Sequence, residues 1–212
     1  MGREPAALIT GAGRGLGKEL ARQYAAEGWK VIGTERRELE MTNIGQIREF
    51  ARKLKGEPID LLFCNAGISG RRGMAPGSFD FDSWEEVLKV NLLGPAALAE
   101  ALIDNVAASG RKTIALMSSR LGSIRESSGM TLPYATSKAA LNMLAKGLAA
   151  TLGSRGIIVV ALSPGWVRTD MGGAGAPLSP EASVQGLRKV ISSLSAADSG
   201  KFLSYDGSEI PW

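Results

Sequence analysis

Short apolar runs alternate along the chain with longer amphipathic stretches, almost from end to end. The apolar runs predict strands at residues 6–10, 30–34, 39–41, 59–64, 113–117, 157–162 and 202–205. The amphipathic stretches predict helices at residues 15–27, 44–54, 83–108, 133–152 and 180–194. Strands separated by helices of this length pair in parallel through right-handed crossovers. The pattern therefore predicts a single doubly wound α/β domain over residues 1–212, with about seven strands and helices on both faces of the sheet.

The longest predicted helix carries two local signals. Ser83 and Glu86 have the spacing of a capping box, which predicts the start of the helix at residues 83–108. Gly94-Pro95 lies inside this helix, and the pair predicts a kink there.

Ligands of doubly wound sheets bind beyond the carboxyl ends of the strands, where the strand order reverses. The residues that end or follow the predicted strands include Thr10, Thr34, Cys64, Asn65, Ser118, Ser119, Ser163 and Pro164. We therefore look for function at these positions.

The composition excludes several chemistries. The 212 residues include no His and a single Cys, Cys64. A nucleophile activated by His, a metal site built on His or several Cys, and an internal disulfide are therefore excluded. An enzyme of this composition must move protons through Tyr, Lys, Asp, Glu or water. One thiol fits a reducing compartment, so we expect a cytoplasmic protein in which Cys64 is a small core residue.

Charge and hydropathy favour a protein that binds neither nucleic acid nor membrane. The net charge is +4, but the basic residues occur as short pairs and form no long run, which is typical of a solvated surface. The longest aliphatic run, residues 157–162, is the length of a strand and too short to span a bilayer. Glycine is abundant, at 27 residues, so many backbone positions turn sharply or approach a neighbour closely.

A glycine-rich turn follows the first predicted strand. Gly11, Gly15 and Gly17 match the pattern G-x-x-x-G-x-G and do not match G-x-G-x-x-G. Glycine permits close backbone approach, and the helix that follows offers free N–H groups to a pyrophosphate. A turn of this kind alone can also serve just to reverse the chain, but its place after the first strand favours a dinucleotide site.

The end of the second predicted strand bears on the choice between NAD and NADP. Glu35 lies 18 residues after Gly17, near the spacing at which an acidic residue meets the adenosine ribose. Arg36 and Arg14 favour NADP instead, because either can bind a 2′-phosphate. We favour NAD(H) over NADP(H); a solvated Glu-Arg-Arg cluster is the alternative. The nucleotide-binding residues predicted so far are Gly11, Arg14, Gly15, Leu16, Gly17, Glu35 and Arg36.

Tyr134 and Lys138 are candidates for proton transfer without His. At i and i+4 they share one face of a helix. An ammonium beside a phenol stabilises the phenolate, so we expect Lys138 to lower the pKa of Tyr134. Taken alone, Y-x-x-x-K arises by chance on many helices. Ser119, which follows the preceding strand, adds a hydroxyl that can hydrogen-bond a substrate oxygen.

These motifs occur in one order along the chain, and together they resemble the short-chain dehydrogenase/reductase family, whose fold is of the Rossmann type. The matching residues are Thr10-Gly11, Gly15, Gly17, Asn65-Ala66-Gly67, Asn91, Ser119, Tyr134, Lys138 and Pro164-Gly165. The stretches 117–124, 164–171 and 200–207 look most like the C-factor and sniffer-type carbonyl reductase branch.

The resemblance implies a role for each matching residue. Tyr134 is expected to be the acid/base and Lys138 to hold the nicotinamide ribose. Ser119, rather than Ser118, is expected to orient the substrate oxygen, and Asn91 to support a water relay. The resemblance further implies contacts to the adenosine half and to the carboxamide through Asn65, Ala66, Gly67, Pro164, Gly165, Val167 and Thr169.

The chain departs from the family pattern at three places. Cys64 replaces an Asn that often precedes Asn-Ala-Gly, and Glu40-Met41 stands where Asp-Val commonly contacts the adenine. A short glycine-rich segment, residues 172–178, replaces the longer helical lid of many relatives, which suggests an open site.

The leading hypothesis is an NAD(P)-dependent enzyme that interconverts a carbonyl and an alcohol, acting on a small molecule as a homodimer or homotetramer. The alternative is a regulatory or signalling dinucleotide-binding protein with little or no turnover. Loop arginines are interpreted as solvated, although they could attract an acidic substrate; they are Arg71, Arg72, Arg120 and Arg125.

Overall fold

One parallel sheet forms the centre of the molecule, as the computed structural model shows for residues 3–71, 73 and 76–212. Within these residues the sheet has six strands in the order β2-β1-β3-β4-β5-β6. They are β1 (Ala6–Thr10), β2 (Lys30–Thr34), β3 (Leu61–Cys64), β4 (Thr113–Met117), β5 (Ile158–Ser163) and β6 (Phe202–Ser204). Every neighbouring pair is parallel, so the doubly wound α/β prediction is confirmed.

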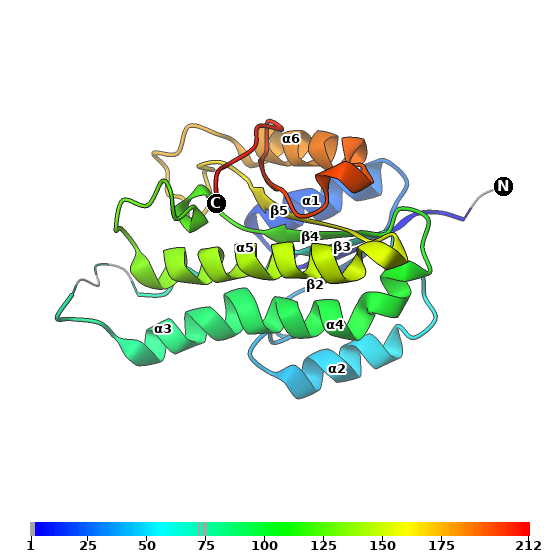
Figure 1. Ribbon diagram of the computed structural model, residues 1–212, viewed down its shortest axis with the longest axis horizontal. Helices are drawn as coiled ribbons and strands as arrows, with labels where there is room; N and C mark the ends of the chain where they lie inside the picture. The colour runs from blue at the N-terminus through cyan, green and yellow to red at the C-terminus, as the bar shows by residue number, and fades with distance from the viewer. Residues whose placement is uncertain (1–2, 72, 74–75) are drawn as a thin grey trace.

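Helices cover both faces of the sheet (Figure 1). They are α1 (Gly15–Ala26), α2 (Ile44–Lys53), α3 (Phe81–Leu88), α4 (Gly94–Ala107), α5 (Leu132–Leu152) and α6 (Pro180–Ser193). Helices α1 and α6 lie on one face, and α2, α4 and α5 lie on the other. Adjacent residues of each strand point to opposite faces, so Ile9 of β1 joins the core under α1 and α6, whereas Leu8 joins the core under the other helices.

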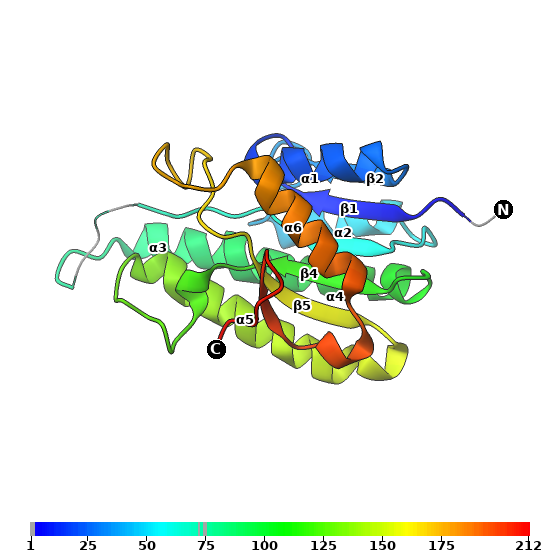
Figure 2. The ribbon, with the colours of Figure 1, turned by 90° about the horizontal axis from the view of Figure 1, so that it is seen from above.

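The chain reverses its direction across the sheet between β1 and β3. After β1 it builds β2 at one edge and then returns to place β3 on the other side of β1. The loops that follow the strands gather at one end of the molecule, opposite the N-terminus (Figure 2). A ligand site is therefore expected between the carboxyl ends of β1 and β3.

The predicted strand at residues 39–41 is wrong, and its absence reduces the expected seven strands to the six described. Leu39 and Met41 are 2% and 4% exposed, and both belong to the core beside α2 and α4. The backbone of Met41 lies so close to α4 that a Cβ on Gly94 would be 2.5 Å from its carbonyl oxygen. Leu39 and Met41 are apolar because they pack in the core, and they form no strand there.

The predicted helix at residues 83–108 is divided in the structure. A five-residue π-helical turn, Lys89–Leu93, separates α3 from α4 and lies directly before the glycine expected to mark a kink. The capping box is also wrong: Asp80 caps α3, and its Oδ1 accepts a hydrogen bond of 3.0 Å from the Ser83 N–H. The Ser83 hydroxyl oxygen instead accepts from the Arg71 N–H at 3.0 Å.

Candidate functional site

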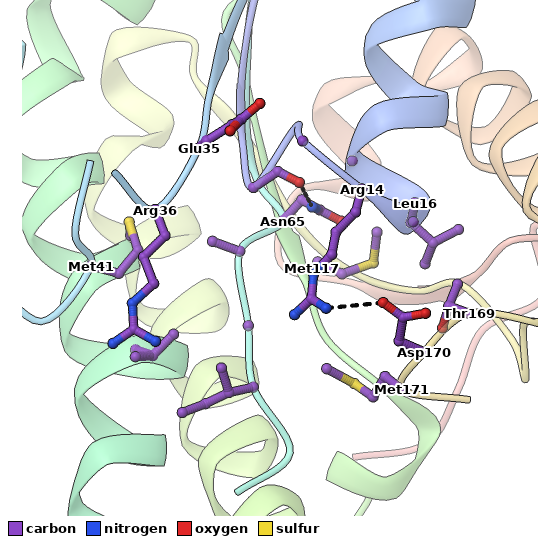
Figure 3. A pocket seen from close by; sticks show the side chains of 18 of the residues that line it. Arg14, Leu16, Glu35, Arg36, Met41, Asn65, Met117, Thr169, Asp170 and Met171 are labelled. Atoms are coloured by element: carbon purple, nitrogen blue, oxygen red, sulfur yellow. Dashed lines mark hydrogen bonds and ion pairs between the residues drawn. The ribbon is translucent and has the colours of Figure 1, made fainter. Parts of the chain in front are cut away.

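A cleft of about 490 Å³ opens at the carboxyl ends of β1, β3 and β4 (Figure 3). Most of the predicted site residues line it. They are Gly11, Arg14, Gly15, Leu16, Gly17, Glu35, Arg36, Asn65, Ala66, Gly67, Tyr134, Lys138, Pro164 and Thr169. Segments far apart in the sequence thus meet at the point where the strand order reverses.

The glycine-rich turn leaves no room for side chains between β1 and α1. Gly11 and Gly15 have φ values of +70° and +53°, which favour glycine. A Cβ on Gly17 would be 2.1 Å from the Gly11 carbonyl oxygen. The first turn of α1 is consequently packed against the end of β1, with its N–H groups at the cleft. This cradle fits the pyrophosphate of a dinucleotide.

Thr10 and Asn65 fasten the ends of β1 and β3 together. The Thr10 hydroxyl oxygen accepts hydrogen bonds of 3.0 Å from the N–H groups of both Asn65 and Ala66. The Asn65 side-chain amide donates to the Thr10 carbonyl at 2.9 Å and to the Gly11 carbonyl at 3.4 Å. Asn65 therefore holds the glycine-rich turn in position, which the sequence pattern alone did not show.

Glu35 lies against the glycine-rich turn, at one side of the cleft (Figure 3). A Cβ on Gly13 would be 2.8 Å from the Glu35 carboxyl carbon, so this glycine makes space for that side chain. Arg37 pairs with Glu35 at 3.4 Å, and Arg36 binds Glu40 at 2.6 Å and lies 3.6 Å from Glu86. Burial of Glu40 disfavours its ionisation, but its hydrogen bonds with Arg36 and Thr42 hold the pKa of the carboxyl below its ordinary value.

Arg14 reaches across the cleft, away from Glu35 (Figure 3). Its guanidinium nitrogen is 2.9 Å from a carboxylate oxygen of Asp170, and both side chains are 81% exposed. The ion pair joins the glycine-rich turn to the loop that follows β5. In this structure Arg14 is thus not directed toward the end of β2, where a 2′-phosphate would be expected.

Tyr134 and Lys138 lie on α5 at the cleft, but the pKa of Tyr134 differs from expectation. Burial raises the pKa of Tyr134 to about 12, against a hydrogen bond with Ser119 that lowers it. The Lys138 ammonium is 5.5 Å from the phenol ring centre and donates a hydrogen bond of 2.7 Å to the Met117 carbonyl. Lys138 faces this carbonyl, and the expected lowering of the Tyr134 pKa by its charge is not observed. Burial lowers the pKa of Lys138 to about 8, against an opposing effect of Cys64.

Asn91 lies in the π-helical turn, fully buried, and links two walls of the site. Its side-chain oxygen accepts from the Ile68 N–H, and its amide nitrogen donates to the Ile68 carbonyl, both at 2.9 Å. The same nitrogen is 3.0 Å from the Ser137 hydroxyl oxygen on α5. A Cβ on Gly67 would be 3.2 Å from the Asn91 oxygen and 3.5 Å from the Lys138 nitrogen, so these three residues are neighbours.

Four predicted residues lie beside the cleft but are not among the described residues that line it: Asn91, Ser119, Gly165 and Val167. Gly165 has a φ of +79° and packs against the Tyr205 ring. Val167 is 4% exposed and pairs with Leu178. Gly165 and Val167 therefore pack within the loop after β5 and do not line the cleft.

The cleft also has lining residues that sequence reasoning missed. Apart from Glu40, Met41 and Ser118, whose positions the sequence analysis marks, they are Gly13, Leu39, Ile68, Val90, Met117, Asp170 and Met171. Most are apolar, and an apolar residue that lines a cleft has the same local pattern as one in the core. Their position follows from the three-dimensional arrangement alone.

Cys64, Arg71 and Arg120 are not among the residues that line the cleft. Cys64 is 2% exposed and belongs to the core, as predicted. Of the loop arginines, Arg71 pairs with Asp80 and Arg120 with Glu126, while Arg72 lies outside the described residues. Within the described part of the chain, no helix is both long and apolar enough to cross a membrane.

Together the strand order and the glycine-rich turn define a doubly wound α/β protein of the dinucleotide-binding type. The family model for short chain dehydrogenases matches residues 5–56 and 38–176. The chain belongs to this family of oxidoreductases, which confirms the resemblance found in the sequence.

Individual relatives agree with this assignment. C-signal of Myxococcus xanthus is 37% identical over 167 residues, which make up 78% of this chain and 100% of that protein. The NADPH-bound carbonyl reductase from chicken fatty liver has a TM-score of 0.89 at 30% identity, covering 99% of this chain and 100% of that chain. Carbonyl reductase Sniffer of D. melanogaster has a TM-score of 0.88 at 29% identity with the same coverage.

Proposed function

We propose that the protein is an NAD(P)-dependent oxidoreductase that interconverts a ketone or aldehyde and an alcohol. The observation that carries the proposal is the placement of Tyr134, whose pKa burial raises and the neighbouring Ser119 lowers, in the same cleft as the glycine-rich turn. A proton donor and a nucleotide cradle in one cleft are what carbonyl reduction requires. In this proposal, residues 1–212 act as one dinucleotide-binding domain.

Each residue of the site has a role in this reaction. Bound nicotinamide dinucleotide would supply the hydride in the reducing direction. Tyr134 then gives its proton to the substrate oxygen, which Ser119 polarises through a hydrogen bond. Lys138 carries a proton at a pKa of about 8, so it can return one to Tyr134 near neutral pH. Asn91 keeps the backbone at Ile68 beside Lys138 and supports that relay.

The dinucleotide would be held by residues that already surround the cleft. Gly11, Gly15, Leu16 and Gly17 face its pyrophosphate at the start of α1. Asn65, Ala66 and Gly67 line the adenosine side, and Pro164 and Thr169 line the opposite wall at the loop after β5. Gly165 and Val167 hold this loop in place through their contacts with Tyr205 and Leu178.

We further propose a preference for NAD(H). Glu35 lies against the turn at Gly13, where its carboxylate can accept from an adenosine ribose and repel a 2′-phosphate. Arg36 is engaged by Glu40 and Glu86, and Arg14 by Asp170. The chicken relative is bound to NADPH, so the preference needs its own test. Replacing Glu35 by Ala should weaken NADH binding and reduce discrimination against NADPH; unchanged affinities for both would contradict the ribose contact.

The partner proteins we propose are further copies of this chain, in a homodimer or homotetramer. Large apolar side chains are exposed on α3, on the π-helical turn and on α5: Phe81 at 71%, Leu93 at 51% and Met143 at 69%. Exposed apolar side chains that form a contiguous patch are typical of protein contacts. Native mass spectrometry would show a single-chain mass if this proposal is wrong.

The reaction itself is tested by dinucleotide-linked absorbance with a panel of small ketones, aldehydes and alcohols. We expect turnover by the natural chain and its loss on Tyr134→Phe. A protein that binds the dinucleotide but turns over none of the panel would instead be a dinucleotide-binding regulator. A cytoplasmic location, expected from the single cysteine, stays a prediction.

A further inference from the structure

Asn142 is a buried polar residue on the same face of α5 as the proposed acid/base. Tyr134, Lys138 and Asn142 are spaced at i, i+4 and i+8, so they form one stripe along the helix. Asn142 is 3% exposed and does not belong to the cleft lining described above. A buried amide at this position must have partners within the protein, because leaving it without hydrogen bonds would be costly.

The Asn142 amide bonds to both ends of the short turn that carries Ser119. The Ser118 hydroxyl donates a hydrogen bond of 2.6 Å to the Asn142 side-chain oxygen. The Asn142 side-chain nitrogen donates a hydrogen bond of 3.2 Å to the Gly122 carbonyl. The Asn142 side chain therefore binds both ends of residues 118–122, one through its oxygen and the other through its nitrogen.

This turn is pressed against α5 where it meets the amide. A Cβ on Gly122 would be 2.8 Å from the backbone carbonyl carbon of Lys138, so glycine is needed for the close approach. Within the turn, the Arg120 N–H donates to the Ser163 hydroxyl oxygen at 3.1 Å. Ser119 lies between the two bonds to Asn142, and its hydroxyl oxygen accepts from the Leu121 N–H at 3.2 Å. Burial raises the pKa of the Tyr134 phenol, and the Ser119 hydroxyl lies close enough to lower it.

We propose that Asn142 is a positioning residue that fixes the Ser119 hydroxyl against Tyr134 by holding both ends of residues 118–122. The effect of Asn142 on catalysis rests on the function proposed above, whereas its contact with residues 118–122 does not. The position requires an amide, because Asp would lose the donor to Gly122 and an apolar residue would lose both bonds. Asn142 acts through Ser119 and touches neither substrate nor dinucleotide.

The contact can be tested without turnover, through the Tyr134 ring carbon that bears the hydroxyl. Its ¹³C resonance in tyrosine-labelled protein reports the hydrogen bond to the phenol, and Tyr134→Phe assigns it. We expect Ser119→Ala and Asn142→Ala to move this resonance in the same direction. The double variant should match Ser119→Ala, because Asn142 acts only through that hydroxyl. A resonance unmoved by Asn142→Ala, or additive shifts in the double variant, would overturn the proposal.

A matched control separates positioning from general loss of stability. Asn105 is also buried, and its side-chain nitrogen donates to the carbonyls of Leu54 and Glu57 at 2.6 and 2.8 Å. Asn105→Ala should lower the melting temperature and leave the Tyr134 resonance in place. If Asn142→Ala does not fold, Ser118→Ala decides the question, since it removes one of the two bonds: a partial shift supports the proposal, and no shift overturns it.

Kinetics with a reducible carbonyl give a second readout. Asn142→Ala should lower kcat by about tenfold to a hundredfold, as misplacement of a catalytic group does, with KM for NADH unchanged. In the Ser119→Ala background the same substitution should lower kcat no further. If the natural chain turns over no carbonyl while the Tyr134 resonance still responds to Asn142, the proposed function fails and the positioning role stands.

Discussion

Replacement of Gly17 by Ala tests the fit between the glycine-rich turn and α1. A methyl group there would be 2.1 Å from the Gly11 carbonyl oxygen and 2.5 Å from the Asn65 side-chain nitrogen. Ordinary contact begins near 3.4 Å, so the turn and the helix must separate by about 1.3 Å, the difference between 3.4 and 2.1 Å. The contact involves backbone, which cannot move aside as a flexible side chain does.

The change in unfolding free energy on Gly17→Ala follows from two opposing effects. Overpacking of this kind costs up to about 3 kcal/mol, and replacing a helical Gly by Ala returns about 1 kcal/mol. We expect a net loss of about 2 kcal/mol in unfolding free energy, which lowers the melting temperature by about 4–8 °C in a protein of this size. NADH binding should weaken as well, because the displaced turn is the pyrophosphate cradle.

A second glycine in a helix provides the control. Gly147 of α5 has no atom within 4 Å of the position where a Cβ would be. Gly147→Ala should therefore stabilise the protein, by about 0.5–1 kcal/mol, and leave NADH binding unchanged. Thermal unfolding and NADH fluorescence titration measure both properties. Melting of Gly17→Ala at or above the natural temperature, with normal NADH affinity, would refute the reasoning.

Two further predictions concern charged groups at the site. Burial lowers the pKa of Lys138 from 10.5 to about 8, so between these pH values the unfolded chain holds a proton that the folded chain does not. The unfolding free energy of the natural chain should therefore rise with pH through this window, relative to that of Lys138→Met. Urea unfolding of both proteins at each pH measures this, and a difference in unfolding free energy that does not change with pH would contradict it. Asp170→Asn should change the unfolding free energy by less than about 1 kcal/mol, because the ion pair of Asp170 with Arg14 is exposed. It should nevertheless speed NADH dissociation, which stopped-flow fluorescence measures. An unchanged dissociation rate would contradict a bridge across the cleft.

The sequence predicted the parts of this protein that depend on local pattern. Strand ends, the glycine-rich turn and the shared helical face of Tyr134 and Lys138 all follow from spacing along the chain. The predicted strand at residues 39–41 is wrong because apolar residues in a buried turn have the same pattern as a short strand. The predicted cap of α3 is wrong because Ser83 and Asp80 are both good capping residues, and the fold selects Asp80.

The remaining features of the site depend on contacts between distant segments. The π-helical turn that carries Asn91 has no signal in residue type. Arg14 and Asp170 are 156 residues apart, and their pairing follows from how the loop after β5 folds back over the cleft. The raised pKa of Tyr134 likewise depends on burial and on the direction of the Lys138 ammonium, which spacing alone does not determine.

The most direct test of the central claim compares the natural chain with Tyr134→Phe in two assays. NADH binding is measured by fluorescence titration, and turnover is followed by NADH absorbance with a panel of ketones and aldehydes. We predict equal NADH affinity for the two proteins, carbonyl reduction by the natural chain, and a loss of about 10²–10⁴-fold in its rate on removal of the phenol hydroxyl. Equal binding with no turnover by either protein would contradict the assignment of the cleft as a carbonyl reductase site.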